Sequence, residues 1–241
     1  EITWNGTPTR DMPREAFGYL PEERGLYPKM VVEDQLLFLA QLYGADRKAA
    51  QQRLDEWLAR LNIEENRRKT VEQLSKGNQQ KIQLIASIIH DPKLIILDEP
   101  FSGLDPVNVE ILKTAVKELN RRGATIIFST HRMEHVEELC ESLCILNKGK
   151  QVVSGNIDQI KSDFGQKEII IEGDHDVEFL RNMPGVLDMK QIRRKSILKI
   201  EDEKYAEPIF NKIVKLGYFK RFQVNEPSIN DIFISKVGHE L

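Results

Sequence analysis

The sequence lacks any apolar run long enough to cross a membrane. Its longest apolar stretches, residues 36–40 and 94–97, fall far below the roughly twenty residues that a transmembrane helix needs. The first residues also show no basic segment followed by an apolar one, which is the pattern of a secretory signal. From these absences we expect a cytoplasmic protein.

Cysteine and excess charge are also scarce. Only two cysteines occur among 241 residues, Cys140 and Cys144, near an expected helix-to-strand boundary. We expect them to be reduced and buried, without a disulfide. With 35 basic and 38 acidic residues the formal net charge is -3, so no positive field attracts nucleic acid or anionic lipid. Nucleic acid is therefore not an expected partner.

The apolar content, 40% of the residues, is sufficient for a packed core. Apolar residues recur at helical spacing between residues 32 and 62 and predict two amphipathic helices, separated near Gly44. Residues 93–98 and 124–128 have the composition of strands on either side of a helix over 107–122, which predicts a βαβ unit. Both strands are apolar runs without alternation, so we expect them to be parallel and buried on both faces, with chemistry at their carboxyl ends.

The pattern changes after Gly155, where short strand-like and helix-like segments follow one another. They indicate a small α+β domain over residues 166–241, after a first domain over residues 1–165. Pro227 and Ser228 predict the start of the last helix of this domain. An acidic residue three positions after the serine fits a variant of the capping box. The other expected elements are strands at 168–172, 186–200 and 219–224 and helices at 177–182 and 205–216.

Two adjacent carboxylates, Asp98 and Glu99, follow the apolar strand and precede Pro100. An acidic pair at the carboxyl end of a strand suits a hydrated Mg²⁺ and an attacking water, because Mg²⁺ prefers one or two carboxylates and keeps several waters. Asp98 is the expected holder of the metal's water shell, and Glu99 is expected to orient or deprotonate the water. The alternative is a solvated strand end without chemistry.

The second strand ends in Ser129, Thr130 and His131. If the two strands are neighbours, the imidazole of His131 lies beside the acidic pair and can contact the terminal phosphate of a substrate. The alternatives are an ordinary core or surface histidine, or a zinc site with His135. The zinc site lacks a third ligand and the glutamate of the H-E-x-x-H pattern.

A third feature is the start of a helix at residues 75–81. Ser75 suits the N-cap, and Gly77 lets a ligand approach the backbone. The free N–H groups and the dipole of such a helix start form an anion site, most simply for a phosphate. By itself this segment is also compatible with a well-capped helix and no ligand.

The order of these features resembles that of the ABC ATPase family. The helix start at residues 75–79, the acidic strand end, the following residues 102–105 and His131 correspond to the family's signature motif, Walker B, D-loop and H-loop. The resemblance covers residues 1 to about 165. It implies a P-loop NTPase-type parallel sheet with a helical subdomain over about residues 29–90.

The same resemblance implies ATP and Mg²⁺ as ligands and a dimer of two copies that sandwiches the nucleotides. In that dimer Ser75, Gly77 and Asn78 would act on the nucleotide held by the other copy, and Asp105 would communicate across the interface. Three positions depart from the commonest family pattern. Lys76 replaces a glycine, Asn78 replaces a glutamine, and Glu22 stands where a glutamine normally contacts Mg²⁺.

Glu22 belongs to a segment, residues 18–28, that looks like the family's Q-loop region. Its carboxylate can still reach the metal or a metal-bound water. Together with the C-terminal extension that ends in residues 226–233, this variant resembles the ATPases of ABC-2 type exporters, including sodium and drug or antibiotic efflux systems. The resemblance implies a peripheral protein on the inner face of the cell membrane, which docks an integral-membrane subunit through the loop over residues 22–32.

The motif G-x-x-x-x-G-K-[ST] occurs nowhere in the sequence. In the family this loop precedes a segment like residues 1–6, which here has the pattern of the end of an early β-hairpin. We therefore expect a truncated fragment. Without the backbone cradle and the lysine that hold the phosphates, it should bind and hydrolyse ATP poorly.

Two other function classes are weighed against the transporter ATPase. A soluble ABC ATPase of DNA repair or translation predicts a long coiled-coil insertion, or tandem cassettes with a basic surface, and neither is present in these residues. A non-catalytic regulatory protein predicts the loss of Glu99 and His131, and both are present.

Overall fold

The computed structural model describes residues 1–23 and 25–237, which divide between His131 and Arg132 into two compact units. Arg24, in the segment that resembles a Q-loop, lies outside the described residues. The boundary that the sequence suggests at residue 165 stays a prediction.

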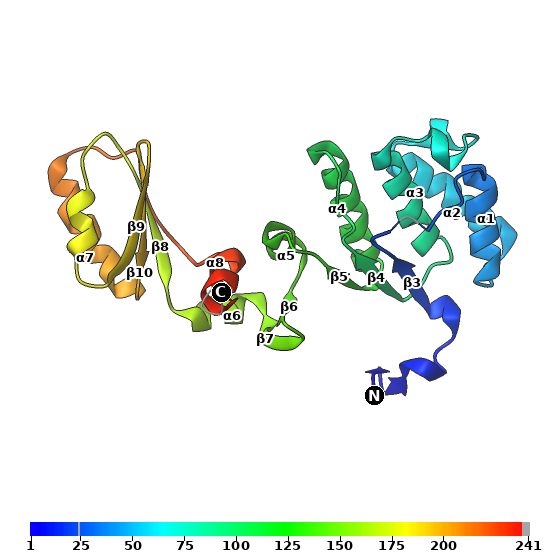
Figure 1. The fold of residues 1–241 in the computed structure, drawn as a ribbon, viewed down its shortest axis with the longest axis horizontal. Coiled ribbons are helices and arrows are strands. Elements are labelled where there is room, and N and C mark those ends of the chain that lie inside the picture. Colours follow the sequence, from blue (N-terminus) through cyan, green and yellow to red (C-terminus); the bar gives the residue numbers. More distant parts are fainter. Residues whose placement is uncertain (24, 238–241) are drawn as a thin grey trace. The chain divides into compact units, whose positions relative to one another are not determined.

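The first unit contains a parallel sheet in the order β3-β4-β5 (Figure 1). Its strands are β3 (Phe17–Leu20), β4 (Leu94–Asp98) and β5 (Thr125–Ser129). Helix α4 (Pro106–Arg121) connects β4 to β5, and the register places Asp98 opposite Ser129. The predicted βαβ unit is therefore confirmed.

The prediction that both strands are buried on both faces holds for most of β4 and is wrong for β5. Leu97 is fully buried, whereas Ile127 is 55% exposed. β5 is an edge strand of this sheet, and its residues alternate between exposed and half-buried. Among the described residues of the first unit, no element covers one face of β5, and that face is exposed.

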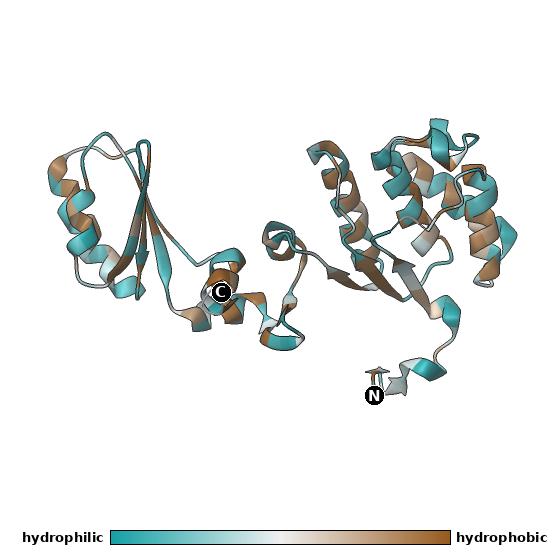
Figure 2. Ribbon diagram, in the orientation of Figure 1, coloured by the Kyte–Doolittle hydropathy of each residue, from teal (hydrophilic) through white to brown (hydrophobic). Residues whose placement is uncertain are grey.

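The helical part of this unit consists of α1 (Val32–Leu42), α2 (Arg47–Arg60) and α3 (Lys76–Ile88). The two helices predicted over residues 32–62 are confirmed. Asp46 caps α2, because its carboxylate accepts the N–H groups of Lys48 and Ala49 at 3.0 Å. Figure 2 shows apolar stripes on these helices beside polar outer faces. The fully buried residues of the stripes are Leu36, Ala40, Ala50, Leu54, Ile82 and Ile85.

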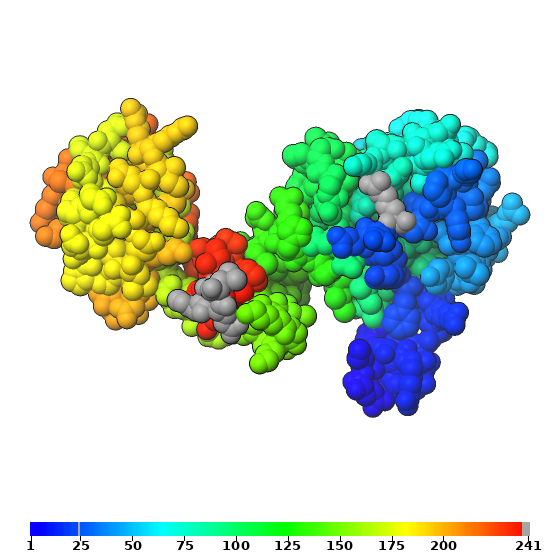
Figure 3. Space-filling view, viewed as in Figure 1, coloured from blue at the N-terminus to red at the C-terminus, as the bar shows by residue number. Residues whose placement is uncertain are grey.

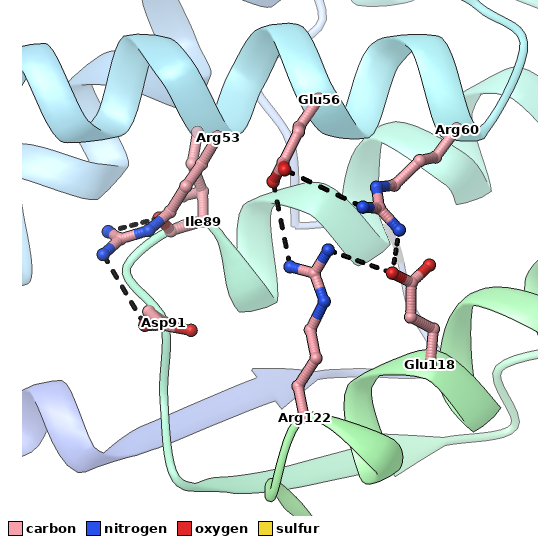
Figure 4. A network of polar contacts seen from close by, with 7 residues as sticks. All are labelled: Arg53, Glu56, Arg60, Ile89, Asp91, Glu118 and Arg122. Carbon is pink, nitrogen blue, oxygen red and sulfur yellow. Dashed lines mark hydrogen bonds and ion pairs between the residues drawn. The ribbon is translucent and has the colours of Figure 1, made fainter.

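A polar network joins α2 to α4 and to the turn before β4 (Figure 4). Arg60 of α2 pairs with Glu118 of α4, and Arg122, just after α4, lies 3.7 Å from Glu56. The guanidinium groups of Arg60 and Arg122 each lie 5.5 Å from the ring centre of buried Trp57. Cations over an indole face are attracted by its quadrupole, so the network helps to hold the helical part against the sheet part.

The chain begins with a small antiparallel hairpin of β1 (Thr3–Trp4) and β2 (Thr7–Pro8). Its turn residues Asn5 and Gly6 both have positive φ, 49° and 80°. Asn-Gly is the favoured pair for such a turn, because it adopts this conformation at little cost. A hairpin is present as predicted, but residues 1–6 contain its first strand and its turn and not its end. The hairpin is the darkest blue part of the surface in Figure 3.

The second unit begins with α5 (Met133–Leu139), the hairpin β6 (Ser142–Asn147) and β7 (Lys150–Asn156), and α6 (Ile157–Phe164). These pack with α8 (Ile229–Val237) around Ile157, Ile229 and Ile232. The capping predicted for the last helix is present, since Ser228 Oγ accepts the N–H of Asp231 at 3.1 Å.

An antiparallel sheet in the order β11-β8-β10-β9 completes this unit. Its strands are β8 (Lys167–Glu172), β9 (Val186–Ile192), β10 (Lys195–Ile200) and β11 (Arg221–Asn225). A 3₁₀ helix (Glu178–Asn182), found where the sequence predicts a helix, and α7 (Ala206–Ile213) contribute Leu180 and Ile209 to the core of this sheet.

The two cysteines are free, as expected, but they differ in environment. Cys140 is half-buried, and burial raises the pKa of its thiol to about 11. Cys144 is exposed, so its predicted burial is wrong. The reason is its position in the two-stranded hairpin β6-β7, where its side chain faces away from the small core around Ile157.

Candidate functional site

The site begins at the carboxyl ends of β4 and β5, which lie side by side in the sheet. Asp98 is the last residue of β4 and is paired in register with Ser129, the last residue of β5. The Ser129 hydroxyl donates a hydrogen bond to Asp98 Oδ1. Asp98 is only half-buried, so the rest of its carboxylate remains available to a metal-bound water.

Glu99 has an unusual backbone conformation, with φ at 45°. Its N–H donates to the Ser129 carbonyl at 3.1 Å, and its carbonyl accepts the N–H of Ser102 at 3.1 Å. A non-glycine residue held in the left-handed region costs about 1 kcal/mol or more, and such residues cluster at functional sites. Here the conformation turns the Glu99 side chain away from the strand direction and across to the end of β5.

The carboxylate of Glu99 is held by three donors from the end of β5. Oε1 accepts the backbone N–H of His131 at 2.8 Å and Nδ1–H of its ring at 2.7 Å. Oε2 accepts the Thr130 hydroxyl at 3.2 Å. The structure thus brings together the acid and the imidazole that the sequence places 32 residues apart.

The exposure of these two side chains differs in a way that suits catalysis. The Glu99 side chain is 16% exposed and fixed, whereas the His131 side chain is 77% exposed. Since Nδ1–H donates to Glu99, a neutral ring presents Nε2 as an acceptor. Only a protonated ring can donate from Nε2 to an anion such as a phosphate oxygen.

The start of α3 has the capping geometry expected from the sequence. Ser75 is its N-cap, and Ser75 Oγ accepts the N–H of Asn78 at 3.2 Å. A side chain at Gly77 would meet Asn108, because an added Cβ would lie 3.0 Å from Asn108 Nδ2. Gly77 therefore lets α3 approach the first turn of α4 closely.

Asp105 caps α4 from the same side, where its Oδ1 accepts the N–H of Asn108 at 3.0 Å. This backbone hydrogen bond lowers the pKa of Asp105, so its carboxylate stays ionised. Asn108 thus contacts both Gly77 and Asp105, and it joins the start of α3 to the start of α4.

Glu22 lies in the loop after β3, which runs parallel to β4, so it follows the same edge of the sheet. Its side chain is exposed. Across residues 1–23 and 25–237 no hydrogen bond or ion pair joins Glu22 to Asp98, and none joins the start of α3 to Glu99. The sites predicted from sequence therefore form two groups within this unit, and Glu22 follows the same edge of the sheet as the first group.

The donor set at the carboxyl edge fits Mg²⁺ bound largely by phosphates and water. No group of three or more His, Cys, Asp or Glu side chains able to hold a metal ion occurs in the described part of the chain. Mg²⁺ in nucleotide sites uses one or two carboxylates, and Asp98, with Glu22 at the same edge, offers them.

Among the described residues, none of the helices has the length and the apolar composition of a transmembrane span.

Several residues that contact the candidate site were not predicted from the sequence. Ser129 and Thr130 could be suspected from two hydroxyls directly before His131, and Asn108 from its place three residues after a capping aspartate. Gln80 and Gln83 gave no signal beyond polar residues on an otherwise apolar helix face. They are 5% and 3% exposed.

Comparisons with known proteins agree with this geometry. The model of the ABC transporter family matches residues 1–102, and a model described as the C-terminal domain of DrrA1-3-like ATP-binding proteins matches residues 155–237. The ABC transporter ATP-binding protein YhaQ of Bacillus subtilis is 52% identical over 237 residues, which cover 98% of this chain and 80% of the relative.

More distant matches extend the same result. The Nod factor export ATP-binding protein I of Burkholderia pseudomallei is 27% identical, over 95% of this chain and 74% of the relative. A solved structure of an ATP-binding subunit of an ABC transporter superposes with a TM-score of 0.61 at 34% identity, over 67% of this chain and 68% of that chain.

Proposed function

This chain belongs to the family of ABC transporter ATP-binding proteins, and on that premise we propose that it is the ATP-hydrolysing subunit of an exporter. The observation that carries the proposal is the carboxylate of Glu99, held by His131 and Thr130 directly beside Asp98 at the edge of a parallel sheet. This is the edge at which parallel α/β sheets bind their ligands.

Each residue of this edge has a distinct part in the proposed reaction. Asp98 holds the water shell of Mg²⁺, which when bound neutralises charge on the phosphates. Glu99 orients or deprotonates the water that attacks the terminal phosphate. His131 contacts that phosphate through Nε2 in its protonated form. Glu22 reaches the metal or one of its waters from the end of β3.

The start of α3 acts on a nucleotide held by a second copy of the protein. Ser75 Oγ already accepts the N–H of Asn78, so its hydroxyl hydrogen remains available for a phosphate oxygen. The exposed helix start offers N–H groups and a positive dipole end to the same anion. Asp105 is linked to Gly77 through Asn108, so closure of the dimer over one nucleotide would be transmitted through Asp105 to the nucleotide site of the other copy.

The 241 residues contain no G-x-x-x-x-G-K-[ST] loop. Turnover requires such a loop, because its backbone N–H groups and lysine hold the β- and γ-phosphates. We therefore expect the 241-residue chain by itself to hydrolyse ATP poorly, and activity is to be measured in a protein that carries this loop.

An apolar groove offers a place for the integral-membrane subunit. Tyr27, Pro28, Lys29, Met30 and Phe38 line a groove with a volume of about 560 Å³. Tyr27 is 58% exposed and Phe38 is 50% exposed. Exposed aromatic side chains that lie close together are typical of protein interfaces, and this pair borders the loop after Glu22. Binding there places the protein at the inner face of the cell membrane.

The direction of transport is supported by the name of one relative, a Nod factor export ATP-binding protein, and by the match of residues 155–237 to a DrrA1-3-like domain. We propose that residues 166–241 form an accessory domain of the exporter ATPase, without a catalytic role.

The proposal is tested with Glu99→Gln in the complete protein assembled with its membrane subunit. The substitution keeps the size of the side chain and removes the base, so steady-state ATP hydrolysis should fall about 100-fold or more while ATP binding persists. Glu110→Gln, on the exposed face of α4, is the matched control and should keep full turnover. Equal turnover in the Glu99 variant would remove this carboxylate from the site.

A further inference from the structure

A buried amide on α3 holds the loop that carries Glu22. Gln83 is 3% exposed, and its Nε2 donates to the carbonyl of Pro21 at 2.8 Å and to that of Glu23 at 3.3 Å. These two carbonyls belong to the residues that flank Glu22. One side chain therefore bonds the backbone of both neighbours of the residue that we assign to the metal.

A second buried amide holds the far end of the same loop. Gln35 of α1 is fully buried, and its Nε2 donates to the carbonyl of Tyr27 at 3.2 Å. Tyr27 also lines the proposed docking groove. The segment from Pro21 to Tyr27 is thus attached at both ends to the helical part, through amides that solvent does not reach.

Burying these two amides costs free energy, because one polar atom of each loses its hydrogen bonds to water. The Oε1 atoms of Gln35 and Gln83 are buried and have no hydrogen-bond partner among the described residues. Burying an acceptor without a partner is unfavourable, and an apolar side chain of similar length would avoid it. The hydrogen bonds that these amides do make are on the donor side, and their acceptors are carbonyls of the loop.

The helix that carries Gln83 also holds the other side of the site. Gln80 lies three residues earlier on the same face of α3, and its Nε2 donates to the carbonyl of Pro100 at 3.0 Å. Pro100 directly follows Glu99. One rigid helix, capped by Ser75, is thus bonded to the loop after β3 and to the loop after β4.

We propose that Gln83 is a positioning residue for Glu22: by bridging the carbonyls of Pro21 and Glu23 it aims the exposed Glu22 carboxylate at the metal edge beside Asp98. An exposed carboxylate on a free loop would lose conformational entropy on each encounter with the metal, and a fixed backbone removes most of that loss. This inference rests on the proposed function, because it assigns Glu22 to the Mg²⁺ of the same site.

The first test needs no enzymatic activity. Gln83→Met keeps the length of the side chain and removes the donor, so the backbone amides of residues 22, 23 and 25–27 should exchange hydrogen at least about tenfold faster, as expected for a loop that opens locally. Gln79→Met is the matched control, since Gln79 also donates to two carbonyls, those of Val71 and Leu74, from the same helix. It should leave exchange in residues 22, 23 and 25–27 unchanged, because the segment that Gln79 holds bonds only to the carbonyls of Pro28 and Met30, beyond these residues. Unchanged exchange in the Gln83 variant would overturn the proposal.

The second test measures the Mg²⁺ concentration that half-saturates ATP hydrolysis by the complete protein. It should rise about tenfold in Gln83→Met, the lower end of what outer partners of metal ligands contribute. It should rise at least as much in Glu22→Ala, and no further in the double variant, because Gln83 acts through Glu22. Additive increases would show that Gln83 acts by another route.

Failure of the proposed function gives a different result. If Glu99→Gln retains full turnover, the hydrolytic assignment is wrong, while faster exchange in Gln83→Met would still show that Gln83 holds the loop. If hydrolysis depends on Glu99 but the Gln83 variant keeps the wild-type Mg²⁺ requirement, only the positioning role is overturned.

Discussion

Nδ1 of His131 lies 2.7 Å from Oε1 of Glu99, and the backbone N–H of His131 donates to the same oxygen at 2.8 Å. The carboxylate is therefore held partly by the main chain of residue 131 and partly by its ring. A substitution of the ring removes one of these bonds and leaves the other.

This division predicts the effect of His131→Ala. Hydrolysis by the complete protein should fall about 100-fold or more, because the ring that contacts the phosphate is lost. The free energy of unfolding should change by less than about 0.5 kcal/mol, since the side chain is 77% exposed. Turnover and chemical denaturation measured on the same preparation separate the two effects. A strongly destabilised variant would show a structural role instead.

The proposed docking groove is tested by Phe38→Asp. A carboxylate in place of this aromatic ring should weaken the complex with the membrane subunit by about 2 kcal/mol or more, as expected for an aromatic anchor at an interface. The measurement is the affinity of the ATPase variant for the detergent-solubilised membrane subunit. Phe179→Asp is the control, because Phe179 is similarly exposed, at 44% against 50%, and lies in the other unit. An equal loss in both variants would argue against a specific groove.

Gly18 of β3 tests how closely α3 must approach the sheet. An added Cβ at this position would lie 2.3 Å from the carbonyl oxygen of Ser87 and 2.9 Å from Pro92 Cγ. Gly18→Ala should therefore destabilise the protein by about 1–3 kcal/mol or more, as overpacking against backbone does. In Gly25→Ala the new methyl group meets no atom within 4 Å among the described residues apart from its chain neighbours, so that variant should unfold at the wild-type denaturant concentration.

The ion pairs of Glu33 should make the stability of the protein depend on pH. It lies 2.7 Å from Arg67 and 2.6 Å from Arg68, and the hydrogen bond from Arg67 lowers its pKa. Because the folded pKa is below the unfolded value of about 4.3, this stabilisation is present above that value and is lost as pH falls through the folded pKa. The melting temperature should therefore drop on acidification below about pH 4.5.

Glu33→Gln should lower the melting temperature at neutral pH and make its further decrease with acid shallower. Arg67→Met should produce the same shallower decrease, because it removes the main cause of the lowered pKa. Thermal unfolding followed by circular dichroism between pH 3 and 7 measures both variants. An unaltered acid dependence in Glu33→Gln would exclude this ion pair as its source.

Much of the fold could be predicted because its signals are local. The helical spacing of Leu36, Ala40 and Leu54 marks α1 and α2, and Ser75 and Ser228 cap the helices that follow them. Residues 94–97 have the apolar composition of a strand without reference to any partner. The neighbouring placement of Asp98 and the end of β5 also followed, once a parallel βαβ unit was assumed.

The exposure of β5 and of Cys144 was predicted wrongly, because burial depends on which elements cover a strand. Apolar residues alone do not show that. The bonds of Gln80 and Gln83 gave no sequence signal for a similar reason. In the sequence, a glutamine that will be buried looks like any other polar residue. Its role becomes visible only when its acceptor is known, and for Gln83 that acceptor is the carbonyl of Pro21, 62 residues away.

The amino-acid sequence by itself determined the elements, their caps, the order of the motifs and the family resemblance, since all of these depend on residues close together in the chain. Only the tertiary structure decided that Glu99 adopts a left-handed conformation, that its carboxylate meets His131, and that α3 is bonded to the loops on both sides of the site. Those features arise from contacts between distant segments, and their geometry is set by strand register and helix packing.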